Sequence, residues 1–247
     1  MAHLDWLNRP IAHRGLHDAA KGIIENTPSA VEAAIDAGYG VEVDVQQAGD
    51  GEAMVFHDHT LDRLTQGTGP LNTRTSAELK HIRFKGTSDR MQTLPELLEQ
   101  VSGRVPLIIE IKSVWHTHGP FERQLANILG ACNWQAAVMS FDPYAIKAYA
   151  QAAPDLPRGL IAGPFRDLHF WGHLSFWKRF YMRHLLSTLI ARPQFVAYDI
   201  GALPSAAPWI WRRVINRPLL AWTVRSDAQR QRAQRAADAM IFEGFRP

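Results

Sequence analysis

The chain lacks most features that mark secreted and membrane-spanning proteins. It has one cysteine, Cys132, so no disulfide can form within the chain, which fits a reducing compartment. No run approaches the ~18 consecutive apolar residues of a membrane-spanning helix, and the first residues, 1–6, lack the basic and then apolar segments of a signal peptide. We therefore expect a soluble, cytoplasmic protein.

Two further absences narrow the class of protein. The isoelectric point is basic, near 9.2, but the lysines and arginines form no continuous run, so we expect no nucleic-acid partner. No nucleotide-binding Gly-x-Gly-x-x-Gly sequence follows the first strand candidate, which favours a barrel over an open doubly wound sheet. What is present is 46% hydrophobic residues in 247, enough for one α/β barrel forming a single domain over residues 1–247.

The charge is unevenly distributed along the chain. Residues 1–160 contain 14 basic and 19 acidic side chains, a balance of −5, whereas residues 161–247 contain 13 and 5, a balance of +8. Six of the eight tryptophans follow position 130. The acidic first part and the basic, aromatic last part each need an explanation.

Short runs rich in β-branched residues alternate with segments of helical period, which predicts an α/β fold with a parallel sheet. The strand candidates are 11–13, 41–46, 53–57, 106–111, 136–140, 158–162, 195–200, 219–224 and 239–243. The helix candidates are 28–37, 95–101, 119–131, 143–152, 167–190, 205–216 and 227–237.

One connection breaks the alternation of strands and helices. Only six residues, 47–52, separate the second and third strand candidates, and they contain the turn sequence Ala-Gly-Asp-Gly. That is too short for a parallel crossover, so strand 53–57 should run antiparallel to 41–46 as a hairpin. The remaining eight strands match a (β/α)8 TIM barrel, and an open doubly wound sheet is the alternative.

Glu42 and Asp44 are the first candidates for chemistry. Residues two apart in a strand share a face, so both carboxylates point the same way from a strand with valines at 41, 43 and 45. Like charges this close are costly unless a cation lies between them. The alternative is a solvated edge strand whose acids have no shared role.

The hairpin should bring a histidine to this pair. If the turn centres near residues 49–51, His57 falls opposite or diagonal to Glu42 and Asp44. A lone histidine is commonly structural, but this register favours a functional one.

Further charged residues end two other strands. The apolar run 106–109 leads to Glu110 and Lys112, and the first strand ends in His13 and Arg14. Barrel enzymes place their sites at these carboxyl ends, although Glu110 and Lys112 could simply pair with each other. Three converging carboxylates would hold a hard cation such as Mg²⁺ or Ca²⁺. With Arg14 and Lys112 for phosphate and two histidines for proton transfer, the set suits phosphodiester cleavage.

The order and spacing of these motifs resemble the glycerophosphodiester phosphodiesterase family, within the phospholipase-C-like barrel phosphodiesterases. The matching sequences are His13-Arg14-Gly15, Glu25-Asn26-Thr27, Glu42-Val43-Asp44, Asp50-Gly51, His57-Asp58, Leu61-Asp62-Arg63, Gly67-Thr68-Gly69-Pro70, Leu94-Pro95-Glu96, Ile109-Glu110-Ile111-Lys112 and Trp222-Thr223-Val224. They cover residues 11–113 densely and the remainder thinly.

The resemblance implies a (β/α)8 barrel with a small insertion near 59–90, and release of an alcohol and sn-glycerol 3-phosphate from a glycerophosphodiester. It further implies specific roles for the residues that match. Glu42, Asp44 and Glu110 would bind a divalent cation. His13 and His57 would form the acid–base pair. Arg14 and Lys112 would bind phosphate, and Trp222 would line the substrate pocket. Attack by the substrate's own glycerol hydroxyl, giving a cyclic phosphate, is an alternative to attack by water.

Two regions depart from the family pattern. The last strand ends in Phe242 and Glu243 rather than in a Thr-Asp-like pair, and the stretch 165–192 has no recognised counterpart. Taken as one helix, 170–185 has an apolar stripe, with Phe176 and Phe180 off the stripe beside Lys178 and Arg179. The first interpretation of the stripe is an outer barrel helix that buries it.

The residues off the stripe leave the function of this segment open. Phe176, Phe180, Lys178 and Arg179 would suit a peripheral contact with the inner face of a membrane, and self-association is a further alternative. The substrate could then be a lysophospholipid, acted on in the manner of a lysophospholipase D. A lipid-binding barrel without catalysis is the weakest hypothesis, because it would have no use for so many buried charges.

Overall fold

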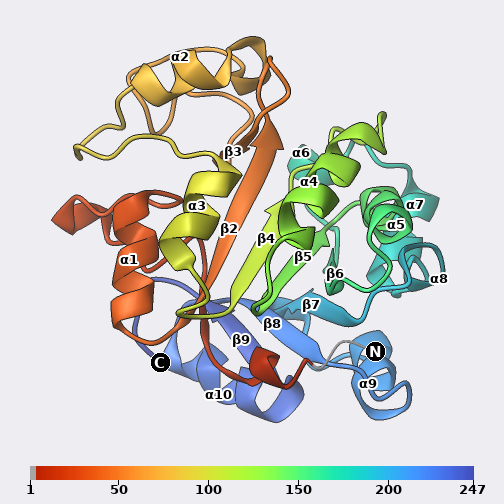
Figure 1. Ribbon diagram of the computed structural model, residues 1–247. Helices are drawn as coiled ribbons and strands as arrows, with labels where there is room; N and C mark the ends of the chain where they lie inside the picture. The colour runs from red at the N-terminus through yellow and green to blue at the C-terminus, as the bar shows by residue number, and fades with distance from the viewer. Residues whose placement is uncertain (1–3) are drawn as a thin grey trace.

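Eight parallel strands close into a barrel in the structure, a computed structural model that describes residues 4–247 (Figure 1). Residues 1–3, the beginning of the segment in which we found no signal peptide, lie outside the described residues. The barrel strands are β1 (Ile11–Ala12), β2 (Gly40–Gln47), β4 (Leu107–Ile111), β5 (Ala136–Ser140), β6 (Arg158–Ala162), β7 (Phe195–Asp199), β8 (Leu219–Val224) and β9 (Ala239–Phe242). Because β1 pairs with both β2 and β9, the ring of eight parallel strands is closed, and the predicted (β/α)8 barrel is confirmed.

Helices connect successive strands and surround the barrel. They are α1 (Pro28–Asp36), α2 (Ser76–His81), α3 (Leu94–Val101), α4 (Pro120–Gly130), α5 (Pro143–Ala152), α6 (Leu168–Trp171), α7 (Phe176–Arg183), α8 (Thr188–Ala191), α9 (Ala206–Arg213) and α10 (Asp227–Ala236). Four short 3₁₀ helices, η1 to η4, occupy Asp5–Asn8, Ala19–Lys21, Leu71–Thr73 and Ile200–Ala202. None of the helices within residues 4–247 has both the length and the apolar character that a membrane crossing requires.

The extra strand, β3 (Ala53–Val55), confirms the predicted hairpin. It pairs antiparallel with β2, and Val45 lies opposite Val55. The carboxyl end of β3 therefore lies beside Asp44, whose carbonyl accepts a hydrogen bond from the Phe56 backbone N–H at 3.0 Å. This register delivers His57 to the same end of the barrel as the β2 carboxylates.

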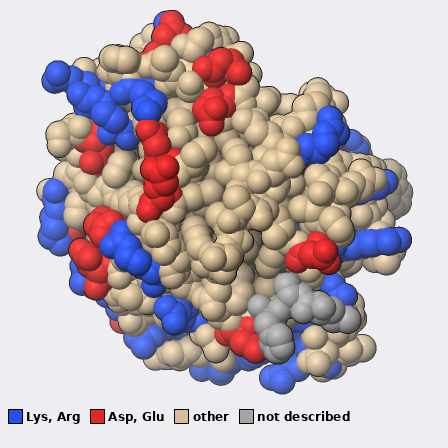
Figure 2. All heavy atoms as spheres, in the orientation of Figure 1, with Lys and Arg blue, Asp and Glu red and all other residues tan. Residues whose placement is uncertain are grey.

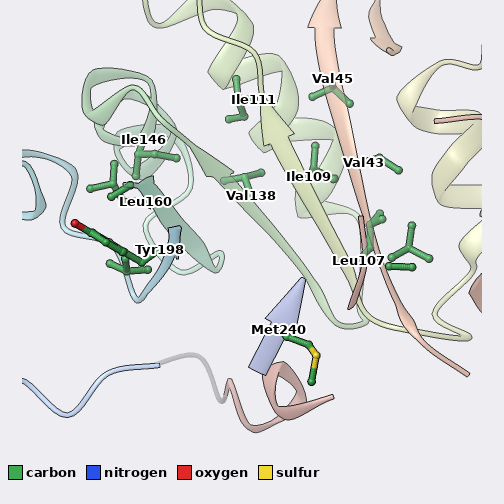
Figure 3. Close-up of a cluster of buried hydrophobic side chains, with 14 of the residues drawn as sticks. Val43, Val45, Leu107, Ile109, Ile111, Val138, Ile146, Leu160, Tyr198 and Met240 are labelled. Atoms are coloured by element: carbon green, nitrogen blue, oxygen red, sulfur yellow. The ribbon is translucent and has the colours of Figure 1, made fainter. Parts of the chain in front are cut away.

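Alternation along the strands divides the buried side chains into two layers. On β2 and β4, Val43, Val45, Ile109 and Ile111 face outward and pack with the helices in one large cluster, part of which Figure 3 shows. The intervening positions face the barrel axis, where Ile108 packs with apolar residues of the other strands. Since inward positions near the carboxyl ends of β2 and β4 carry acids instead, the fold itself assembles a charged site there.

The predicted insertion forms a separate lobe beside the hairpin. It contains η3 and α2, and its core buries Phe56, Leu61, Leu71, Leu79 and Phe84. A complete capping box at Thr75 and Glu78 begins α2. The lobe carries Arg63 toward the mouth of the barrel.

The single helix expected over 167–190 is wrong. Three short helices, α6, α7 and α8, replace it, and the caps Asp167 and Ser175 begin the first two. The predicted buried stripe divides accordingly, because Leu174 and Leu185 are buried whereas Phe170 and Trp177 are 67% and 73% exposed. Phe176 and Phe180 are exposed, as the sequence pattern indicated.

Gly15 generates a prediction about stability. It has a φ of +77°, and a Cβ built there would lie 2.7 Å from the carbonyl carbon of Ala30 on α1. Gly86 has the same φ of +77°, with nothing within 4 Å of such a Cβ. Gly86→Ala should therefore cost about 1 kcal/mol, from backbone strain alone, and Gly15→Ala about 2 kcal/mol more, from overpacking. Denaturant unfolding of both variants measures the difference, and equal losses would contradict it.

Candidate metal and phosphate site

Three buried carboxylates lie together at the carboxyl end of the barrel. Glu42 and Asp44 project inward from β2, and Asp44 is the direct neighbour of Glu110 on β4. One oxygen from each residue lies within 4.8 Å of the others, and Glu42 and Asp44 are fully buried. The convergence expected from the sequence is therefore present in the fold.

The electrostatics of the three carboxyl groups differ. Burial, and then the neighbouring Asp44 and Glu110, raise the pKa of Glu42 well above its usual range. Burial also raises the pKa of Glu110, although Lys112 opposes it. Burial alone would raise the pKa of Asp44 too, but the charges of Lys112, His57 and Arg14 outweigh it and lower that pKa. Without further positive charge, the three groups do not ionise together easily.

The group fits a divalent cation. Buried Glu42 Oε1 has no hydrogen-bond partner among residues 4–247, which leaves an acceptor that an ion could satisfy. Carboxylate oxygens are the ligands that hard cations such as Mg²⁺ and Ca²⁺ prefer. Glu42, Asp44 and Glu110 would hold the ion, which would relieve the repulsion that raises the pKa of Glu42.

Two basic side chains border the carboxylates. Lys112 Nζ lies 2.9 Å from Asp44 Oδ1 and 2.7 Å from Glu110 Oε1. Arg14 Nε lies 3.4 Å from Asp44 Oδ2, while its NH1 donates to Glu25 Oε1 at 2.6 Å. Both side chains are mostly buried but keep an exposed part, so they can meet a phosphate arriving from the mouth.

The loop after β1 forms hydrogen bonds with the two carboxylates of β2. Arg14 and Asn26 both have a left-handed φ, of 56° and 58°, which non-glycine residues adopt at a cost. In this conformation the Arg14 backbone N–H donates a hydrogen bond to Glu42 Oε2 at 2.9 Å. The Asn26 side chain donates to Asp44 Oδ2 at 2.8 Å and accepts from the Asp44 N–H at 3.1 Å. This strained loop orients both carboxylates.

His13 lies next to Glu42 and is held by the end of the chain. Its Nε2 is 3.9 Å from Glu42 Oε2, and its Nδ1 is 2.5 Å from Glu243 Oε2, just beyond β9. Glu243 also lies 2.5 Å from Arg225 Nε and 3.8 Å from His17 Nε2. Burial lowers the pKa of His13, and the hydrogen bond to Glu243 opposes this shift. Glu243 therefore fixes the orientation of the ring and leaves Nε2 facing the carboxylates.

His57, like His13, is held by a carboxylate through its Nδ1 atom. Its Nδ1 lies 2.7 Å from Asp58 Oδ1, and Arg63 Nε donates to Asp58 Oδ2 at 2.6 Å. Arg63 also donates to Glu25, which links the insertion lobe to Arg14. Burial lowers the pKa of His57 to about 4, although the charge of Asp44 opposes it. Each histidine thus has one nitrogen paired with a carboxylate.

Trp222 lies among aromatic side chains instead of the charged groups. Its ring is 5.3 Å from that of Phe141, and Phe141 in turn contacts Phe165 and Trp171 at 6.3 and 4.9 Å. The indole Nε1 donates to the Ala162 carbonyl at 3.2 Å. These residues come from the carboxyl ends of β5, β6 and β8, so they give the mouth an apolar side.

The remaining predicted residues stand apart from the site. Phe176, Lys178, Arg179 and Phe180 all belong to α7, on the outside of the barrel. Glu243, which touches His13, and Asn26, which touches Asp44, are not among the site residues predicted from the sequence. The unusual Glu at the end of the last strand was the one signal that could have indicated Glu243.

Comparison with known proteins agrees with this geometry. A family model described as the glycerophosphoryl diester phosphodiesterase family matches residues 13–171. The chain belongs to this family. Residues 13–171 include the histidines, the three carboxylates, Arg14 and Lys112, whereas Trp222 and Glu243 lie beyond the match.

Two curated relatives match this chain over part of their length. The glycerophosphodiester phosphodiesterase of Caldanaerobacter subterraneus subsp. tengcongensis is 35% identical in an alignment of 161 residues that covers 61% of this chain and 65% of that protein. Glycerophosphodiester phosphodiesterase 1 of Bos taurus is 42% identical in an alignment of 184 residues that covers 68% of this chain and 54% of that protein. The matches thus span less than two thirds of these relatives.

Solved structures are similar over almost the entire chain. A phosphodiesterase of Oleispira antarctica, in complex with its product sn-glycerol-3-phosphate, has a TM-score of 0.75, 20% identity, and coverage of 95% of this chain and 92% of that one. A glycerophosphodiester phosphodiesterase of Thermotoga maritima has a TM-score of 0.72, 23% identity, and coverage of 98% and 96%. At these identities the likeness establishes the fold.

The convergence of Glu42, Asp44 and Glu110 predicts that the protein binds a divalent cation, which calorimetry can measure. Glu42→Gln removes one anionic ligand while keeping the shape of the side chain, so the affinity for Mg²⁺ or Ca²⁺ should fall at least about tenfold. Isothermal titration with each ion measures the dissociation constants. The matched control is Glu99→Gln, an exposed residue of α3, which should bind like the wild type. Equal affinities for wild type and Glu42→Gln would exclude this site.

Proposed function

We propose that this chain hydrolyses glycerophosphodiesters to an alcohol and sn-glycerol 3-phosphate. The observation that carries the proposal is the convergence of three buried carboxylates, two basic side chains and two histidines at the mouth of one barrel. Membership of the family, and the names of the curated relatives, support the same reaction. The product named for the Oleispira antarctica structure is the one proposed here.

Binding of the diester rests on charge. Arg14 presents a planar fork of donors and Lys112 a compact ammonium, and both suit the oxygens of a phosphate. Burial at the mouth strengthens these interactions because little water competes there. Mg²⁺ or Ca²⁺ on the three carboxylates would add a Lewis acid that neutralises phosphate charge.

The histidines divide the two proton transfers. When water attacks phosphorus, one imidazole accepts its proton while the P–O bond to the alcohol breaks, and the other imidazole donates a proton to the leaving oxygen. Glu243 holds His13 through Nδ1 and Asp58 holds His57 through Nδ1, which leaves the Nε2 atoms for these transfers. If the substrate's own glycerol hydroxyl attacks instead, the same pair acts and a cyclic phosphate results.

A lysophospholipid is a second candidate substrate, and the aromatic side of the mouth favours it. Phe141, Trp171 and Trp222 are partly exposed and give the mouth an apolar surface, which buried Phe165 supports from behind. Such a surface suits a diester bearing an acyl chain. The ratio of kcat/KM for lysophosphatidylcholine and glycerophosphocholine tests this candidate. Trp171→Ala should lower the value for the lysolipid and leave that for glycerophosphocholine within about twofold.

Removal of either histidine tests the reaction. His13→Ala and His57→Ala should each lower kcat on glycerophosphocholine by at least about a hundredfold, because each loses one proton transfer. Phosphorus NMR in the presence of Mg²⁺ follows substrate and product directly. His81→Ala, at an exposed position on α2, is the matched control and should keep the wild-type rate. Equal rates for wild type and His13→Ala would refute catalysis by this pair, and no turnover by any form would favour a lipid-binding barrel.

Glu243 should act by positioning His13. Glu243→Gln keeps the size of the side chain but removes the charge that fixes the ring, so kcat should fall at least about tenfold while KM changes little. Arg225→Gln removes another partner of Glu243 and keeps the bond to His13, so it should stay near the wild type. Steady-state kinetics separates the two outcomes, and a matching loss in both variants would assign Glu243 a merely structural role.

A further inference from the structure

Exposed apolar side chains gather on one side of the barrel. Of the thirteen large hydrophobic residues that are exposed within the described chain, eleven lie between positions 168 and 215. The densest part is the α6–α7 face, which we define as Leu168, Phe170, Phe176, Trp177 and Phe180. The ring of Trp177 contacts those of Phe176 and Phe180, at 5.3 and 6.2 Å between centroids. A contiguous exposed aromatic patch of this kind marks an interaction surface.

The segment already buries what it can against the barrel. Leu174, Met182 and Leu185 face the core, and Met182 is the only buried residue of α7. Three of the eight residues of α7 are exposed aromatics instead, so the barrel does not account for them. Their role requires a partner outside the chain.

Charge around the α6–α7 face indicates what that partner is. Residues 164–218 contain eight lysines and arginines and two acidic residues. Lys178 and Arg179 lie between the aromatic residues of the face along α7, and neither forms an ion pair with any residue in 4–247. Figure 2 shows basic side chains along the margin of the molecule where α7 and α8 lie in Figure 1. Exposed aromatics interleaved with unpaired basic residues suit an anionic lipid surface.

The place of this face in the fold connects it to the mouth. The segment that carries it follows β6, and Trp171 at the end of α6 packs on Phe141 and Phe165. One side of the same short helix therefore contributes to the aromatic side of the mouth, while Leu168 and Phe170 point to solvent. A surface that contacts the α6–α7 face would lie next to the entrance of the site.

We propose that the α6–α7 face is a peripheral docking surface for a bilayer containing anionic lipids. Phe176, Trp177 and Phe180 enter the interfacial region, and Lys178 and Arg179 meet the anionic headgroups. The mouth of the barrel then opens beside the membrane. The docking depends on neither the cation nor turnover, so it stands apart from the proposed reaction.

Vesicle sedimentation in EDTA tests the docking without catalysis. The protein should sediment with phosphatidylcholine vesicles that contain phosphatidylserine, and much less with phosphatidylcholine alone. Phe176→Ser/Trp177→Ser should lower the partition coefficient at least about tenfold. Lys178→Gln/Arg179→Gln should lower binding to the phosphatidylserine vesicles roughly fivefold per charge, and should change binding to neutral vesicles little.

Tyr144→Ser is the matched control, since Tyr144 is an exposed aromatic on α5 and is not one of the residues that define the face. It should sediment like the wild type, and circular dichroism checks that every variant is folded. Equal sedimentation of wild type and Phe176→Ser/Trp177→Ser would overturn the proposal. So would a dimer that Phe176→Ser/Trp177→Ser abolishes in the absence of vesicle binding, because the face would then belong to a second copy. Vesicle binding by a protein that hydrolyses no diester would overturn the proposed function and leave this surface intact.

Discussion

The mutual repulsion of Glu42, Asp44 and Glu110 is the constraint on which the rest of the site depends. Three carboxylates within 4.8 Å of one another, removed from water, are unfavourable unless positive charge is supplied. Lys112 and Arg14 supply part of it, and Asn26 adds hydrogen bonds to Asp44. The buried Glu42 Oε1, without a partner among residues 4–247, marks where the compensation is incomplete. A divalent cation bound there would complete it.

The barrel imposes this convergence through its geometry. Alternate residues of β2 and β4 face the axis, and the parallel register places Asp44 beside Glu110. The same alternation sends the valines and isoleucines outward against the helices, as Figure 3 shows for this part of the core. The stability that apolar packing supplies outside the barrel therefore supports an electrostatically costly arrangement inside it. Second partners, Glu243 and Asp58, then fix the two imidazoles around the carboxylates.

The parts of this account that were predictable from the sequence depend on local patterns. Glu42 and Asp44 share a face because they are two apart, and the short Ala-Gly-Asp-Gly turn fixed the hairpin that delivers His57. The Glu243–His13 contact joins residues 230 apart, and no periodicity signals it. The prediction of one helix over 167–190 was wrong because the apolar spacing of the segment fits a single helix, whereas the cap at Ser175 begins a new one. Capping residues within an apparently periodic run are the local signal of such a division.

The uneven charge along the chain now has a physical explanation in its acidic part, where three of the carboxylates form the inner site. The central claim is that a divalent cation lies among them, and crystallography with Mn²⁺ tests it most directly. Crystals of the protein soaked in Mn²⁺ should give an anomalous difference peak about 2.2 Å from one oxygen each of Glu42, Asp44 and Glu110. The peak should be absent from Glu42→Gln crystals treated identically. Saturating Mn²⁺ that gives no peak among these three residues, with the wild-type fold intact, would contradict the account.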